Sequence, residues 1–126
     1  MMQRDAIYIG GEWVEANGEG TIEVVNPATE QTIGSVPVGS SSDVDAAVAA
    51  ARTAFPEWSA SSLEVRIEAL NAISAALKER GEELAQLITA EVGTPIGYSR
   101  MAMVGTPRVV ARSYAKMLEN YQFEEE

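Results

Sequence analysis

The hydrophobic pattern of this chain changes its period once, close to Ser40. Before Ser40, short β-prone runs are separated by glycine, asparagine and proline. After Ser40, apolar residues recur every three or four positions, which is the spacing of amphipathic helices. The pattern predicts an N-terminal β-hairpin and short strands, followed by three to four helices, as part of an α/β body.

The strands are delimited by turn residues. Gly10-Gly11 separates a run over residues 6–9 from Glu12–Val14, and glycine readily adopts the positive φ that a two-residue hairpin needs. Two further strands are predicted over Thr21–Val25 and residues 31–38. Pro27 cannot donate to a strand ladder, so the first of these two ends before it.

Capping patterns predict where the first two long helices begin. Ser42 with Asp45, and Ser61 with Glu64, each resemble a capping box. Pro56 is expected to end the first helix, because a proline inside a helix removes a hydrogen bond.

Glycine and proline also divide the C-terminal half. Gly93 followed by Pro95 predicts the end of a third helix. Gly105-Thr106-Pro107 predicts an interruption, after which a helix restarts with Thr106 as its N-cap. The expected buried face of that last helix is Val110, Tyr114, Met117 or Leu118, and Tyr121.

Composition excludes several classes of chemistry. The 126 residues include no cysteine and no histidine, which rules out a thiolate nucleophile, a disulfide framework and a Ser-His-Asp triad on this chain. Nineteen acidic residues against nine basic ones give a net charge of -10, which disfavours nucleic acid and anionic membranes as partners. No apolar run approaches the length of a membrane span, so a cytoplasmic protein is expected.

The glycines do not form a dinucleotide-binding motif. Gly10, Gly11, Gly18 and Gly20 lie in predicted turns between strands, and no helix opens directly behind them.

Glu91 is a carboxylate at a position that is unfavourable unless a positive group compensates its charge. It lies in the last turn of its predicted helix, where negative charge meets the negative end of the helix dipole. Arg100 or plain solvent could compensate it, and so could a monovalent cation held by oxygen ligands.

Taken in order, these segments resemble the aldehyde dehydrogenase superfamily over essentially the whole chain. Each is weak alone, and their order and spacing carry the resemblance. The matching segments are Tyr8-Ile9-Gly10-Gly11-Glu12-Trp13; Val25-Asn26-Pro27-Ala28-Thr29-Glu30 with Ile33 and Val36; Asp43-Val44-Asp45-Ala46-Ala47-Val48 with Ala51, Arg52, Ala54, Phe55 and Trp58; Arg66 and Leu70; and Leu84-Ala85, Leu87-Ile88-Thr89, Glu91, Gly93 and Pro95.

The resemblance implies a fold and a reaction. Members of this family oxidise aldehydes to carboxylic acids with NAD or NADP, using a cysteine nucleophile and a glutamate base. The chain would then be the N-terminal part, residues 1–126, of an incomplete Rossmann-like NAD(P)-binding domain. Because it lacks the cysteine and matches only that part, this chain alone is expected to be inactive and to bind no cofactor.

Two groups of site residues are implied by the resemblance. In some relatives, backbone carbonyls at the positions of Val24 and Val25, with an acidic residue at Glu91, hold a monovalent cation. Ala102, Met103 and Thr106 would lie near the substrate tunnel, where their small or flexible side chains suit an apolar aldehyde. The alternative is that these three residues simply pack.

The end of the chain, residues 121–126, resembles the family's approach to its next strand, so a fragment or one half of a split enzyme is expected. The alternative is a non-catalytic helical module that binds a partner, either a second copy or a complementing C-terminal polypeptide. A subunit that joins full-length relatives is a third possibility.

Overall fold

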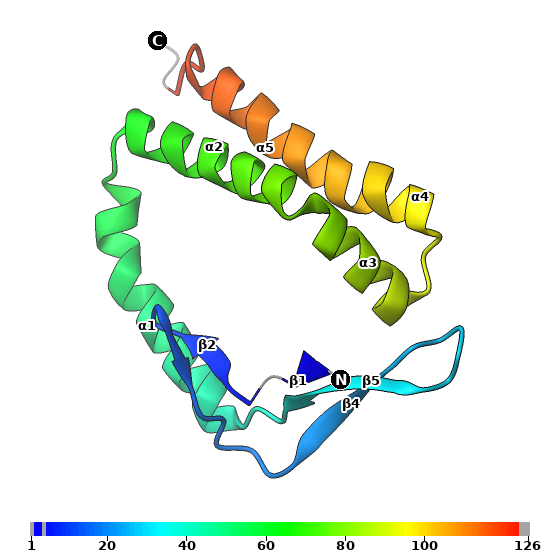
Figure 1. The fold of residues 1–126 in the computed structure, drawn as a ribbon. Coiled ribbons are helices and arrows are strands. Elements are labelled where there is room, and N and C mark those ends of the chain that lie inside the picture. Colours follow the sequence, from blue (N-terminus) through cyan, green and yellow to red (C-terminus); the bar gives the residue numbers. More distant parts are fainter. Residues whose placement is uncertain (1, 4, 124–126) are drawn as a thin grey trace. The chain divides into compact units, whose positions relative to one another are not determined.

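The computed structural model describes residues 2–3 and 5–123, and it divides into two compact units, Met1–Ala60 and Ser61–Glu126. The first unit contains all the strands and one helix, and the second is helical (Figure 1). The α/β class and the order of strands before helices are therefore confirmed. None of the helices in the described ranges is long and apolar enough to cross a membrane.

The predicted hairpin is present in the first unit. Strands β2 (Ile7–Ile9) and β3 (Glu12–Val14) pair antiparallel around Gly10 and Gly11, whose φ angles are 64° and 93°. Two successive positive φ angles are what a tight hairpin turn demands. Tyr8 pairs with Trp13 across the strands, and their rings meet edge to face at 5.3 Å.

A second sheet has the strand order β1-β5-β4. Strand β1 (Met2–Gln3) runs parallel to β5 (Thr32–Pro37), and β4 (Thr21–Val25) runs antiparallel to it. The pairing passes from Val24 opposite Gly34 to Val25 opposite Thr32, so Ile33 is an extra residue at a β-bulge.

Helix α1 (Ser41–Ser59) begins and ends differently from the prediction. Its N-cap is Ser40, and the capping box is completed by Asp43 rather than by Ser42 with Asp45. Asp43 is favoured because it also accepts hydrogen bonds from Asn17, a partner that only the folded chain supplies. The expected stop at Pro56 is also wrong, because α1 continues for three residues beyond it.

The second unit consists of helices that follow one another with little intervening chain. They are α2 (Leu63–Glu79), α3 (Gly81–Val92), α4 (Ile96–Tyr98), the π-helix η1 (Ser99–Val104) and α5 (Gly105–Leu118). Helices α2 and α5 lie side by side (Figure 1). The N-cap of α2 is Ser62, one residue after the predicted Ser61, and Gly93 ends α3 with a φ of 78° as predicted.

The expected interruption at Gly105-Thr106-Pro107 does not occur. Helical backbone runs without a break from α4 through η1 into α5. In an α-helix the Pro107 ring would clash with the carbonyl of Met103, four residues earlier. Met103 lies in the π-helix, whose turn is wider, so the helical path can pass through this proline.

The buried face of α5 also differs from the prediction. Among the described hydrophobic residues, those that are buried are Ala85, Val104, Ala111 and Ala115. Val110, Tyr114 and Met117 are exposed instead. The small alanines allow the backbone of α5 to approach its neighbours closely.

Candidate functional site

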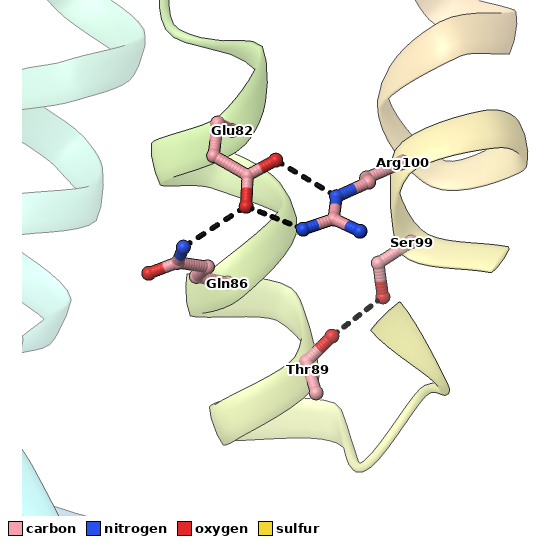
Figure 2. A network of polar contacts seen from close by, with 5 residues as sticks. All are labelled: Glu82, Gln86, Thr89, Ser99 and Arg100. Atoms are coloured by element: carbon pink, nitrogen blue, oxygen red, sulfur yellow. Dashed lines mark hydrogen bonds and ion pairs between the residues drawn. The ribbon is translucent and has the colours of Figure 1, made fainter. Parts of the chain in front are cut away.

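The segment that follows α3 is fixed by buried hydroxyl groups. The side chain of Ser99 is fully buried at the first position of η1. Its Oγ lies 2.9 Å from Oγ1 of Thr89 on α3 and donates to the carbonyl of Thr94 at 3.3 Å. Figure 2 shows Thr89 and Ser99 facing each other across the turn. These contacts hold the turn over residues 93–95 and the start of η1 against α3.

At the next residue, Arg100, a two-bond ion pair with Glu82 joins the same two elements. Nε and Nη2 of Arg100 donate to the two carboxylate oxygens of Glu82 at 2.8 and 2.7 Å, and the Gln86 amide donates to Glu82 at 2.9 Å (Figure 2). The hydrogen bonds from Arg100 and then Gln86 lower the pKa of Glu82 to about 2, and the carboxylate raises the pKa of Arg100. Glu82 and Arg100 are therefore both charged at neutral pH.

A hollow of about 580 Å³ lies beside this ion pair. It is lined by the end of α2, the start of α3, η1 and the first turns of α5, and Glu82, Arg100 and Met101 contribute to its wall. Of the three predicted tunnel residues, Thr106 lines this hollow, and Ala102 and Met103 do not. Ala102 is half-buried, and Met103 and Thr106 are exposed. The tunnel itself stays a prediction.

The three predicted cation ligands lie in different units. Val24 and Val25 are in β4 next to the β-bulge of the first unit, and Glu91 is near the end of α3 in the second. Arg100, the arginine proposed as the alternative partner of Glu91, pairs with Glu82 instead. Glu91 has no ion-pair partner within the described ranges. The cation site therefore also stays a prediction.

Sequence reasoning missed Ser99 and the Glu82–Arg100 pair. No pattern in the sequence marks a π-helix, and the two charged residues are 18 positions apart. In the described part of the chain, no three residues of the histidine, cysteine, aspartate or glutamate types gather as metal ligands would.

The comparisons with known proteins agree with one another. The sequence profile of the Aldehyde dehydrogenase family matches residues 13–126. A curated relative from Staphylococcus aureus (strain bovine RF122 / ET3-1), whose name places it among the aldehyde dehydrogenases, is 43% identical over 120 residues. That match covers 94% of this chain and 25% of the relative.

Solved structures give the same result. The aldehyde dehydrogenase from Bartonella henselae superposes with a TM-score of 0.93 at 28% identity, over 99% of this chain and 26% of that one. A variant of aldehyde dehydrogenase C from Pseudomonas syringae, solved with NAD+ and octanal, superposes with a TM-score of 0.92 at 41% identity, over 97% and 25%. The chain spans about a quarter of the length of these relatives and corresponds to the N-terminal part of their fold. By sequence and by structure, it belongs to the aldehyde dehydrogenase family.

Proposed function

We propose that this chain serves as the N-terminal part, residues 1–126, of the NAD(P)-binding domain of an aldehyde-oxidising enzyme. The observation that carries this proposal is the similarity over nearly its whole length to aldehyde dehydrogenases, one of them solved with NAD+ and octanal. The assembled enzyme would convert an aldehyde into a carboxylic acid with NAD or NADP as the oxidant. A cytoplasmic location and an oligomeric assembly belong to the same proposal.

The isolated chain should be catalytically inactive. The family reaction begins with attack by a cysteine thiolate, and the sequence contains no cysteine. Its glycines also do not lie in a dinucleotide-binding loop, since Gly10 and Gly11 form a hairpin turn and Gly18 and Gly20 lie between β3 and β4. We therefore assign none of its residues to catalysis or to contact with the cofactor.

We expect no NADH when the purified chain is mixed with NAD and an aliphatic aldehyde such as octanal. The measurement is the near-ultraviolet absorbance of NADH, with a complete aldehyde dehydrogenase under the same conditions as positive control. Turnover that stays with the chain through purification would contradict the proposed inactivity.

The supporting roles of individual residues remain proposals as well. We propose that Ala102, Met103 and Thr106 line the path of an apolar aldehyde, and that Val24, Val25 and Glu91 hold a monovalent cation. The exposed Met103 and Thr106, the bulge beside Val25 and the unpaired Glu91 support these roles. Thermal melts in potassium and in choline chloride test the cation: potassium should stabilise the chain, and Glu91→Gln should remove the difference.

A second candidate function is a binding module, or one half of a split enzyme. The observation that favours it is the exposed apolar face of α5, with Val110, Tyr114 and Met117. Adding a separately produced C-terminal polypeptide of a relative, which carries the cysteine and the glutamate, distinguishes the candidates. Restored NADH formation would indicate a split enzyme, and stable binding without turnover would indicate a module.

A further inference from the structure

We propose that the groove between α2 and α5 binds a small anion that carries two phosphate groups. The groove is a hollow of about 560 Å³, lined on the α2 side by residues spaced along one helical face. Lys78 contributes from α2, and Arg108 and Arg112 contribute from α5. This site is separate from every residue assigned above to the aldehyde reaction.

Positive charge is concentrated in this groove, although the chain as a whole is acidic. The net charge is -10, with nine basic residues in the sequence. Four of these nine, Lys78, Arg100, Arg108 and Arg112, line this groove or the adjoining hollow at the start of α5. Among the described residues, the one carboxylate that lines either space is Glu82, which is already bound by Arg100.

The three cations of the groove are not neutralised by any described carboxylate. Within the described ranges, Lys78, Arg108 and Arg112 form no ion pair with a carboxylate. Arg108 and Arg112 are one helical turn apart, where like charges repel each other and weaken the helix. A bound anion would remove that repulsion and would gain charge-assisted hydrogen bonds from the two guanidinium groups.

The walls of the groove are held in register. Oγ of Ser74 on α2 donates to the backbone carbonyl of Arg108 on α5 at 3.1 Å, which connects the two helices beside the groove. Asn71 adds an amide to the same wall, and Ala75 and Val109 are its apolar members.

The lining also indicates which kind of phosphate compound fits. None of the described residues that line the groove is aromatic, so a nucleobase would find no stacking surface on them. Two phosphate groups, by contrast, match a lysine and two arginines in charge and in donor number. The expected ligand is therefore inorganic diphosphate or a sugar bisphosphate rather than a nucleotide.

The test is calorimetric titration of the full chain with inorganic diphosphate at constant ionic strength. A single saturable site is expected. The double variant K78Q/R112Q should raise Kd by about ten-fold or more, because it removes two charge-assisted contacts. Arg112→Gln alone should also weaken binding, and Arg112→Lys, which keeps the positive charge, should retain most of the affinity that Arg112→Gln loses.

Lys116→Gln provides the matched control. Lys116 is also exposed on α5, it lines neither hollow, and its replacement changes the net charge by the same amount as Arg112→Gln. It should change Kd by less than about two-fold, as expected for a screened surface charge. Circular dichroism verifies that each variant is folded.

A parallel titration with fructose 1,6-bisphosphate separates an inorganic from an organic ligand. Saturable binding of either compound that is lost in K78Q/R112Q and kept in Lys116→Gln supports the proposal. If Lys116→Gln loses as much affinity, binding depends only on the overall charge of the protein, and the proposal is overturned. Absence of saturation below about 10 mM, weaker than any useful metabolite affinity, would also overturn it.

Discussion

At the start of α1, the carboxylate of Asp43 accepts four hydrogen bonds. Two come from Asn17, from its backbone N at 3.0 Å and its Nδ2 at 2.6 Å, and two come from Ser40, from its N at 2.7 Å and its Oγ at 2.9 Å. Asp43 thereby caps the helix and fastens the connection between β3 and β4 to it. These hydrogen bonds, led by the one from the Ser40 backbone, lower the pKa of Asp43 from 3.8 to about 2.

Asp43→Asn should therefore lower the melting temperature and change its pH dependence. Because the pKa of Asp43 is depressed by folding, its stabilisation is complete above the unfolded value near 3.8 and is lost as the pH falls toward 2. As the pH is lowered between these values, the melting temperature should fall less in the variant than in the wild type. Glu82 titrates in the same range, so only the difference between the two proteins reports on Asp43.

Asp45→Asn serves as the control for that comparison. Asp45 lies in the first turns of the same helix but is exposed, and no hydrogen bond to its carboxylate is present in the described structure. Equal destabilisation by the two substitutions would contradict the role given to Asp43.

A second prediction at the residue scale concerns Ser99. Ser99→Ala would leave the half-buried hydroxyl of Thr89 without its partner, since the two oxygens are 2.9 Å apart. Losing one partner of a buried hydrogen bond costs about 1–3 kcal/mol. Urea unfolding should show that the free energy of unfolding decreases by about this amount. Ser113→Ala, at an exposed position on α5, should have almost no effect, and a similar decrease there would argue against the role of Ser99.

At the scale of elements, two glycines should respond in opposite directions to alanine. A Cβ at Gly18 would clash with the carbonyl oxygen of Val38, so Gly18→Ala forces the backbone apart and should cost about 1–3 kcal/mol. A Cβ at Gly97 meets nothing within 4 Å. Gly97 is helical, so Gly97→Ala should be neutral or stabilise by about 0.5–1 kcal/mol. Denaturant midpoints of the two variants check both signs.

Elements whose limits depend on local chemistry were predictable from the sequence. Gly10-Gly11 predicts the hairpin and Gly93 predicts the end of α3, because each position requires a left-handed backbone. Limits that depend on distant residues were not predictable. The N-cap of α1 is Ser40 because Asn17, 26 residues from Asp43, also donates to that carboxylate.

The candidate site likewise has features that local sequence predicts and features that depend on distant residues. The family resemblance, rather than a helical pattern, pointed to the region around Thr106, and no local signal announces the π-helix beside it. Ala111 and Ala115 are buried where Tyr114 was expected, because close packing against neighbouring helices favours small residues. The pairing of Arg100 with Glu82 rather than Glu91 likewise depends on how α3 and η1 pack.

For the whole molecule, exposed apolar side chains favour self-association, and the net charge opposes it. Large apolar residues are exposed in both units, among them Val44, Phe55, Tyr114 and Met117. At neutral pH the charge of -10 keeps copies apart, and this repulsion vanishes near the isoelectric point of about 4.4.

Light scattering should therefore show self-association that increases as the pH falls from neutral toward 4.4. Tyr114→Ser with Met117→Ser should reduce it without changing the net charge. A mass that stays at 13.5 kDa throughout this range would contradict the expectation.

The π-helix has a consequence for the genetics of this chain. A π turn arises when one residue is inserted into an α-helix, and each residue of an α-helix turns the chain by about 100°. Deleting a single codon between Ser99 and Val104 should therefore convert the segment into a continuous α-helix and rotate all of α5 about its axis. Ala111 and Ala115 would leave their buried positions, although no core residue had been replaced. This short stretch should accordingly tolerate very few changes in length.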